Sequence, residues 1–198
     1  TTVGSIGTVI NDVYIGTGDT TLRFADGSDA ILPTGTNSAT RDGAIDLGHS
    51  SHRFKDAYLS GGVYLGGAGS SNKLDDYEEG TWTPTIHSVG TLNNNKAIYT
   101  KVGNLVTAYL YISASATQNG VQFRIGGLPF EATSTNYYAG GSLGYCGSLN
   151  TNDWCQPLVL NSSNRIYFHK NNGGAHVLNN QVPAGTPLII QVTYTTNS

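Results

Sequence analysis

Four carboxylates lie within five residues of the segment "LDDYEEGTWTP" at positions 74 to 84: Asp75, Asp76, Glu78 and Glu79. Carboxylate oxygens can bind Ca²⁺, and a pair of carboxylates can cleave a glycosidic bond. Counted from Asp75, Gly80 is at the sixth position of a calcium loop, but the acidic residues do not alternate and position twelve is Ile86 instead of glutamate. Carboxylates this close in sequence are not assigned across a sugar ring. We therefore expect a solvated junction, in which charge keeps an exposed strand edge from pairing with other chains.

Other short motifs also depart from catalytic and metal-binding patterns. The glycine-rich "GGAGSSNK" at 66 to 73 has Asn72 where a phosphate-binding loop needs a glycine before the lysine. The segment "GGSLG" at 140 to 144 has the GxSxG spacing, but a nucleophilic serine needs a strand–turn–helix elbow, and we expect no such elbow in a chain with almost no helix. His49 and His52 could line a metal site if copies of the chain converge on an axis, or they are exposed loop residues. The sequence predicts no enzyme activity, no catalytic residue, no metal site and no cofactor.

Three loops, at 133 to 141, 148 to 156 and 169 to 176, combine aromatic with amide and other polar side chains. Tyrosine and tryptophan rings stack on the apolar faces of sugars, while Asn, Asp and His bond to hydroxyl groups, so the composition suits glycan recognition without catalysis. The alternative is that the aromatic residues fill the interior of the domain. The candidate receptor-binding residues are Tyr137, Tyr138, Asn152, Asp153, Trp154, Asn171, Asn172 and His176.

The second half of the chain has the period-two alternation of β-strands. In "AIYTKVGNLVTAYLYIS" at 97 to 113, we expect Val102, Val106 and every second residue to Ile112 on one face, with a bulge or tight turn at Gly103-Asn104. Eight or nine such segments are spaced regularly over about 115 residues. This spacing predicts an antiparallel β-sandwich of jelly-roll-like type over residues 85–198.

The first half consists of short pieces that end in glycine: "DVYIGTGD" at 12 to 19, "AIDLGHS" at 44 to 50, "DAYLSGG" at 56 to 62 and "GVYLGGAG" at 62 to 69. Strands this short carry too few apolar side chains per face to offset the entropy of ordering the backbone. The segment "FADGSDAILPTGTNSATRDG" at 24 to 43 contains turn residues, and we expect only loops there. We infer that partner chains supply the missing interior.

Charge divides the chain at Gly80. Residues 1–80 carry eleven acidic and five basic side chains, a net charge of −6, whereas residues 81–198 carry two acidic and five basic side chains, a net charge of +3. The asymmetry is either a solvated imbalance or evidence of two parts with different partners. Five basic residues over the second part do not form a nucleic-acid footprint. No apolar stretch is long enough to insert into a membrane.

Composition adds three expectations. Only 12% of the residues are charged, while the chain has 26 glycines and 12 tyrosines, which favours an all-β protein with almost no helix. Cys146 and Cys155 could close a hairpin as a disulfide or could be two buried thiols. The chain begins without methionine and lacks the features of a signal peptide, so we expect a fragment of a longer protein.

The segment "AIDLGHSSHRFKDAYLSGGVYLGGAGSSNKLDDYEEGTWTP" at 44 to 84 resembles a region of tail-fibre and related structural proteins of tailed bacteriophages. In those proteins a pattern of the form LG…RFKD.YLSGG.YLGG…LDDYEEGTWTP precedes a variable C-terminal β-domain. The match extends over about forty residues almost without a gap, and "NDVYIGTGDTTLRFADG" before it is similar to what precedes that pattern.

The resemblance implies a homotrimeric fibre. It divides the chain into an intertwined trimeric β-shaft of short strands at 1–76, a junction at 77–84 and a C-terminal β-sandwich head at 85–198. The head is then expected to attach the virion to a bacterial surface receptor, with a glycan as the favoured ligand and the rest of the tail fibre as a further partner. The location implied is the virion, acting outside the cell.

Two alternatives from other functional classes stay open. A polysaccharide depolymerase would need paired carboxylates in a groove, and residues 85–198 contain only Glu131 and Asp153, which could pair between chains. A virion structural or decoration protein would bind no receptor at all.

Overall fold

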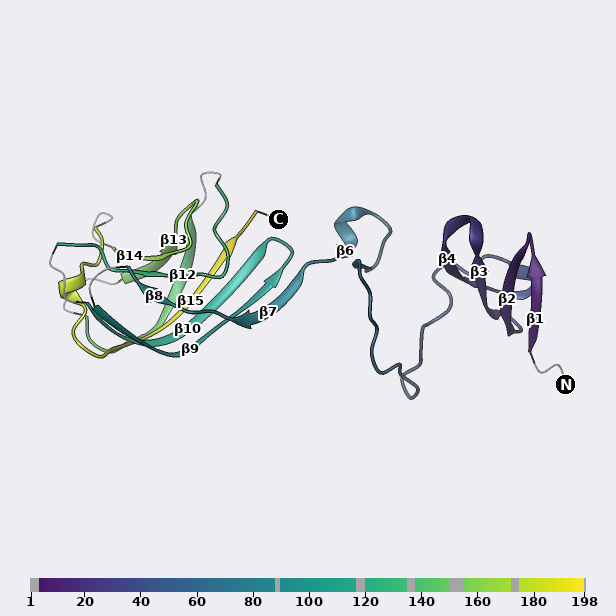
Figure 1. The fold of residues 1–198 in the computed structure, drawn as a ribbon, viewed down its shortest axis with the longest axis horizontal. Coiled ribbons are helices and arrows are strands. Elements are labelled where there is room, and N and C mark those ends of the chain that lie inside the picture. Colours follow the sequence, from purple (N-terminus) through teal and green to yellow (C-terminus); the bar gives the residue numbers. More distant parts are fainter. Residues whose placement is uncertain are drawn as a thin grey trace. The chain divides into compact units, whose positions relative to one another are not determined.

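The computed structural model describes residues 4–87, 90–116, 120–134, 138–149, 155–171 and 175–197, without the side chains of Asn94 and Asn95. Strands and short 3-10 turns make up the regular structure of these residues, which confirms the prediction of an all-β chain. The chain divides into two units, residues 1–59 and residues 60–198 (Figure 1). Each unit has its own sheet, and each is described separately below.

Unit 1 contains a four-stranded antiparallel meander, in which each strand pairs with the next one in the chain. Two-residue turns connect the first three strands, as the paired ends at Val9 with Asp12 and Thr17 with Thr20 show. The strands are β1 (Ser5–Val9), β2 (Asp12–Thr17), β3 (Thr20–Ala25) and β4 (Ala30–Thr34), with 3-10 turns η1 (Asp26–Ser28) and η2 (Thr36–Ser38).

Strand β4 corrects the expectation of loops over residues 24 to 43. The Asp26-Gly27 pair does make a turn, but the residues that follow it return alongside β3. Pro33 lacks the N–H group that a central strand would need, and it is tolerated because β4 is the edge of the sheet. The pieces at 44 to 50 and 56 to 62 were expected to be extended strands and form none, because no neighbouring strand is present to pair with them.

Unit 2 contains a small two-stranded sheet and a nine-stranded antiparallel sheet. The small sheet pairs β5 (Val63–Tyr64) with β6 (Lys73–Leu74), after the 3-10 turn η3 (Ser70–Asn72). The large sheet has the order β7-β9-β10-β15-β12-β13-β14-β11-β8. Its strands are β7 (Tyr77–Thr81), β8 (Thr85–Ile86), β9 (Gly90–Val102), β10 (Leu105–Ala116), β11 (Arg124–Gly126), β12 (Ala139–Cys146), β13 (Cys155–Val159), β14 (Ile166–Lys170) and β15 (Thr186–Thr195), with the turn η4 at Asn179–Gln181.

The large sheet curls so that its two ends enclose one interior. Strand β12 changes partner along its length: Ala139 and Gly140 pair with β13, whereas the residues from Gly141 onward pair with β15. A side chain at Gly141 would place its Cβ 2.5 Å from the carbonyl oxygen of Gln191, so the sheet bends where the sequence has two glycines. Figure 1 shows the long strands β9, β10 and β15 curving together opposite β13 and β14.

The interior of the curled sheet is a single cluster of buried apolar residues. Val106, Leu110 and Ile112 of β10 have no exposed surface, and neither has Ile166 of β14 from the other end of the sheet. Phe123 packs against Phe168, with ring centroids 5.1 Å apart. The period-two alternation that the sequence predicts is therefore confirmed in β10, β14 and β15, where every second residue along most of the strand is buried.

The hairpin between β9 and β10 confirms a tight turn at Gly103-Asn104 and corrects the position of Val102. Gly103 has φ +57°, as the first position of a two-residue hairpin turn allows for glycine. Because Val102 pairs with Leu105, the turn places residue 101 opposite residue 106. The core face of β9 therefore carries Lys101, and Val102 is 46% exposed. The alternation of buried and exposed positions shifts by one residue across a two-residue turn, so the prediction for Val102 is wrong.

Two leucines of β10 test this assignment of faces. Leu110 is fully buried and Leu105 is half exposed, although they lie on the same strand. We expect Leu110→Ala to lower the free energy of unfolding of unit 2 by about 2–5 kcal/mol, because it removes buried methyl groups and leaves a cavity. Leu105→Ala should cost less than about 1 kcal/mol. Urea unfolding followed by circular dichroism measures both, and equal losses would contradict the assigned faces.

Candidate functional site

The sheet of unit 1 turns its large apolar side chains toward solvent. The strand register places Ile15 between Ile6 of β1 and Leu22 of β3. Residues opposite one another on antiparallel strands project from the same side, and so do residues two apart along one strand. One side of the sheet, called the apolar face here, therefore carries Ile6, Val13, Ile15, Leu22, Phe24, Ile31 and Pro33.

The exposure of these side chains is large for residues of their type. Pro33 is half-buried, and the exposure of the other six ranges from 42% for Val13 to 76% for Ile6, with Phe24 at 44% and Ile31 at 61%. Single exposed apolar residues are common on protein surfaces, but adjacent rows on one face are not. The sequence indicated that the first half could not enclose an interior, but it did not identify this face. The alternation in "DVYIG" and "TLRF" could have done so.

The opposite side of the same sheet holds polar groups that bond to one another. The Arg23 guanidinium contacts the buried Asp12 carboxylate, with 2.6 Å between Nη2 and Oδ2. The hydroxyl groups of Thr21 and Thr34 are 2.6 Å apart and buried. The hydrogen bond from Arg23, together with one from the Asp26 N–H group, lowers the pKa of Asp12. The polar groups on this side thus find hydrogen-bond and ion-pair partners within the chain, whereas the apolar side chains on the other side remain exposed to solvent.

This arrangement is inverted relative to a sheet that folds alone in water. Such a sheet buries its apolar face and leaves polar side chains in solvent. In unit 1 it is the ion pair and the threonines that are shielded, while the isoleucines, Leu22 and Phe24 are open. An exposed apolar patch of this kind marks an interaction surface. The apolar face is the main candidate functional surface of unit 1.

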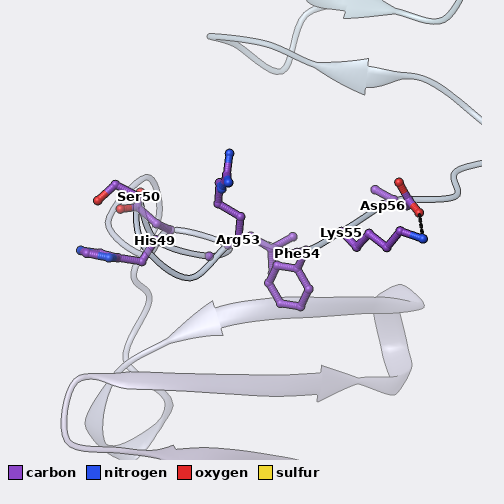
Figure 2. Close-up of a pocket in the computed structure, with 10 residues that line it drawn as sticks. His49, Ser50, Arg53, Phe54, Lys55 and Asp56 are labelled. Carbon is purple, nitrogen blue, oxygen red and sulfur yellow. Dashed lines mark ion pairs between the residues drawn. The ribbon is translucent and has the colours of Figure 1, made fainter.

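The segment that follows the sheet folds around an open hollow lined by residues 46–50 and 53–57 (Figure 2). His49 and His52 exchange two backbone hydrogen bonds of 2.9 and 3.0 Å, and the Ser51 hydroxyl lies within 2.9 Å of each imidazole Nδ1. Arg53 and Phe54 project to opposite sides of the backbone in Figure 2. Phe54 is 67% exposed, so the hollow is an open feature of a loop and not a formed ligand site.

The second half of the acidic stretch, with Glu78 and Glu79, lies in β7, which is one of the two edge strands of the large sheet. Tyr99 of β9 reaches across β7 and donates its hydroxyl hydrogen to the Glu78 carboxylate. It can do so because residue 80 is glycine: a Cβ there would lie 2.8 Å from the Tyr99 ring. The hydrogen bond to Glu78 is the main reason that the pKa of Tyr99 is raised. The sequence "EEG" therefore has a structural role at the sheet edge.

A second contact fixes the start of β7. The Asp76 carboxylate pairs with the ammonium group of Lys101, whose side chain is only 7% exposed. The Lys101 ammonium also lies 5.5 Å from the centre of the Phe130 ring. Phe130 in turn packs edge-on against Tyr99 at 5.5 Å, and its carbonyl accepts a hydrogen bond from Tyr194. We call this set of residues the β7 clasp: Asp76, Glu78, Tyr99, Lys101 and Phe130.

The β7 clasp answers the question raised by the four carboxylates. Asp76 and Glu78 are bonded within the sheet, Asp75 pairs with Lys73 at 2.9 Å, and Glu79 accepts a hydrogen bond from Tyr77. Within the described ranges no group of three or more His, Cys, Asp or Glu side chains could hold a metal ion. The sequence did not predict that a buried Lys101 would pair with Asp76, because the position of Lys101 depends on the change of face across the Gly103-Asn104 turn.

The candidate receptor-binding residues fall partly within the described structure. Tyr138 is 68% exposed and precedes β12, while Asn171 and His176 are exposed beyond the far end of β14. Tyr138 is next to Ala139, which pairs with Val159 at one end of β13. His176 pairs with His169, which in turn pairs with Gln156 near the other end of β13. The described members are thus not gathered in one place. Tyr137, Asn152, Asp153, Trp154 and Asn172 lie outside the described residues.

The cysteines and the membrane expectation can also be placed. Cys146 and Cys155 are half-buried thiols and do not form a disulfide, and burial raises the pKa of the Cys146 thiol. Among the residues that the structure describes, no helix has the length and apolar character that crossing a membrane requires.

Comparison with known proteins gives no family model, curated protein or solved structure that matches the chain.

Asp76 provides a test of the β7 clasp. We expect Asp76→Asn to lower the free energy of unfolding of unit 2 by about 1–3 kcal/mol, because the buried Lys101 charge loses its partner. Lys101→Met in the same chain should restore most of that loss. Asp75→Asn is the matched control, since its partner Lys73 is exposed and little change is expected. Similar urea midpoints for the two single variants would contradict the clasp.

Proposed function

We propose that the chain is the C-terminal part of a bacteriophage tail fibre that acts as a homotrimer. Residues up to about 76 would form an intertwined shaft, and the sheet of unit 2 would be a jelly-roll-like β-sandwich head. The head would attach the virion to a bacterial surface glycan by multivalent binding without catalysis. The resemblance of residues 44–84 to tail-fibre proteins suggests this class.

The exposed apolar face of unit 1 is the observation that carries the proposal. Burying a side chain such as Leu, Ile or Phe gains about 1.5–3 kcal/mol relative to leaving it in water. The face presents six such side chains of at least 42% exposure on one small sheet. Three copies that direct these faces toward a common axis would give unit 1 the interior that a single chain lacks. A closed symmetric assembly also leaves no apolar face open for further association.

The segment after the sheet supports the same assembly. Leu47 is 82% exposed and Tyr58 is 92% exposed, in a stretch whose described residues form no strand. Backbone and side chains of this kind gain order when neighbouring chains pack against them. An intertwined shaft would supply those neighbours from the other two copies.

Attachment without catalysis is the proposal for the head. Its residues carry a net charge of +3 per chain, which favours approach to an anionic cell surface. Three tethered heads raise avidity by roughly 10² to 10⁴ when all can bind together, so each site can be weak. The carboxylates that the structure describes at β7 are bonded within the sheet, which supports binding over polysaccharide cleavage.

Polar substitutions on the apolar face test the proposal. We expect the paired change Leu22→Gln and Phe24→Gln to abolish assembly, because the interior between copies would have to bury amide groups. Attachment of the labelled protein to susceptible bacteria should then fall by roughly 10² or more, since the heads are no longer tethered. Sedimentation velocity and flow cytometry measure the two effects.

Ser28→Gln, in the exposed turn between β3 and β4, is the control and should leave both assembly and attachment unchanged. An unchanged assembly state for the paired variant would contradict the role of the apolar face. New reducing ends after incubation with host polysaccharide would favour a depolymerase. A wild-type protein that assembles but binds no cell would favour a virion structural protein without a receptor.

A further inference from the structure

One outward face of unit 2 collects basic and aromatic side chains. In β8, β11 and β14 the inward positions hold apolar residues such as Ile86, Ile125 and Ile166. The alternate positions project from the opposite face, where Arg124 pairs in register with Tyr167 and accepts a backbone hydrogen bond from His87 at 3.2 Å. The outward set, called the basic face here, is His87, Arg124, Arg165, Tyr167, His169 and His176.

The Arg124 guanidinium contacts an aromatic ring and donates one side-chain hydrogen bond. Its Cζ atom lies 5.1 Å from the centre of the Tyr167 ring, and its Nε group donates a hydrogen bond of 3.0 Å to Gln122. Both contacts orient the group, but neither neutralises its charge. No ion pair joins Arg124 or Arg165 to an acidic residue of the described chain.

Burial favours the neutral form of two histidines on this face. Loss of solvent lowers the pKa of His87, and the neighbouring charges of Arg165 and Arg124 lower it further. His169 and His176 meet edge to face at 4.3 Å, and the Nε2 atom of His169 is buried without a hydrogen-bond partner among the described residues. Loss of solvent, with His176 adding to it, also lowers the pKa of His169. Two permanent charges and three imidazoles therefore share one face without a described counter-ion.

Most acidic residues that the structure describes in unit 2 lie on other elements. Asp75 and Asp76 lie between β6 and β7, Glu78 and Glu79 belong to β7, and β7 and β8 are at opposite edges in the order of the large sheet. Glu131 is exposed and forms no ion pair with the described residues. Among the described residues of unit 2, four of the five acidic side chains thus lie at positions 75 to 79, and the fifth, Glu131, pairs with neither arginine.

We propose that the basic face is the receptor site and that it binds an acidic polysaccharide of the uronic-acid type. The planar guanidinium groups suit the carboxylates, which they can bind through paired hydrogen bonds. The Tyr167 ring offers a surface on which the apolar side of a sugar can lie. Among the candidate receptor residues in the loops that the structure describes, only His176 belongs to this face. The inference rests on the proposed attachment function and adds the site and the class of ligand.

Binding of the full chain to a soluble polygalacturonate, measured by calorimetry, tests the proposal. We expect Arg165→Gln to weaken binding by about tenfold, as the loss of one charge-assisted contact implies. Lys96→Gln is the matched control, because it removes one exposed positive charge from β9 outside the basic face and should change affinity by less than about twofold. Arg124→Gln with Arg165→Gln should abolish binding, and raising ionic strength from about 0.05 M to about 0.5 M should weaken the wild type.

Several outcomes would overturn the inference. Equal losses for Arg165→Gln and Lys96→Gln would show that only net charge matters. Binding of neutral dextran, or equally tight binding of single-stranded DNA or a phosphate-bearing glycan, would reject the uronate class. Thermal melting shows whether a variant is folded, and Arg124→Lys keeps the charge if Arg124→Gln is not folded. If the wild type assembles and attaches to cells but binds no polyuronate, this inference fails while the attachment function stands.

Discussion

The unsatisfied apolar face of unit 1 is the constraint from which the rest of the account follows. A four-stranded sheet that shields its ion pair and Thr21 and Thr34 while exposing its isoleucines is unfavourable for a lone chain in water, because the apolar side chains remain hydrated. The same sheet is well suited to an assembly in which each copy covers the apolar face of the others. The proposed assembly would also account for the low content of regular structure in residues 35–62, because short extended pieces gain order beside neighbouring chains.

Unit 2, in contrast, buries its apolar side chains within one chain. Its curled sheet buries a continuous apolar cluster, and a glycine pair in β12 allows the strand to turn from one set of partners to the other. The β7 clasp then attaches the acidic stretch to the edge of this sheet through a buried lysine and a tyrosine that crosses a glycine. The self-contained interior leaves the outward face of β8, β11 and β14 available for basic side chains, which carry the proposed recognition of acidic glycans.

The sequence predicted those parts of the fold that depend on local alternation. Val106 to Ile112 show a clear period of two, so the buried face of β10 and the turn at Gly103-Asn104 were found correctly. Val102 was placed on the wrong face because the parity of a strand changes across a two-residue turn. Strand β4 was missed because Pro33 and the surrounding turn residues gave no sign that β3 would lie beside them.

The candidate sites could not be predicted from local alternation alone. The Asp76 to Lys101 pair and the basic face both join residues from strands that are distant in sequence, and only the register brings them together. The outward alternation of "RIYFHK" contained Arg165, Tyr167 and His169, but nothing in the sequence showed that Arg124 would lie beside them.

Counting the subunits tests the central claim most directly. The chain can be coexpressed with a second version that carries a short terminal tag, and the purified mixture analysed by native mass spectrometry. A trimer predicts four species, with none, one, two or three tagged chains, built on a protomer of 20.9 kDa. Only two species, each a single folded chain, would show that unit 1 tolerates its apolar face in water and would contradict the account.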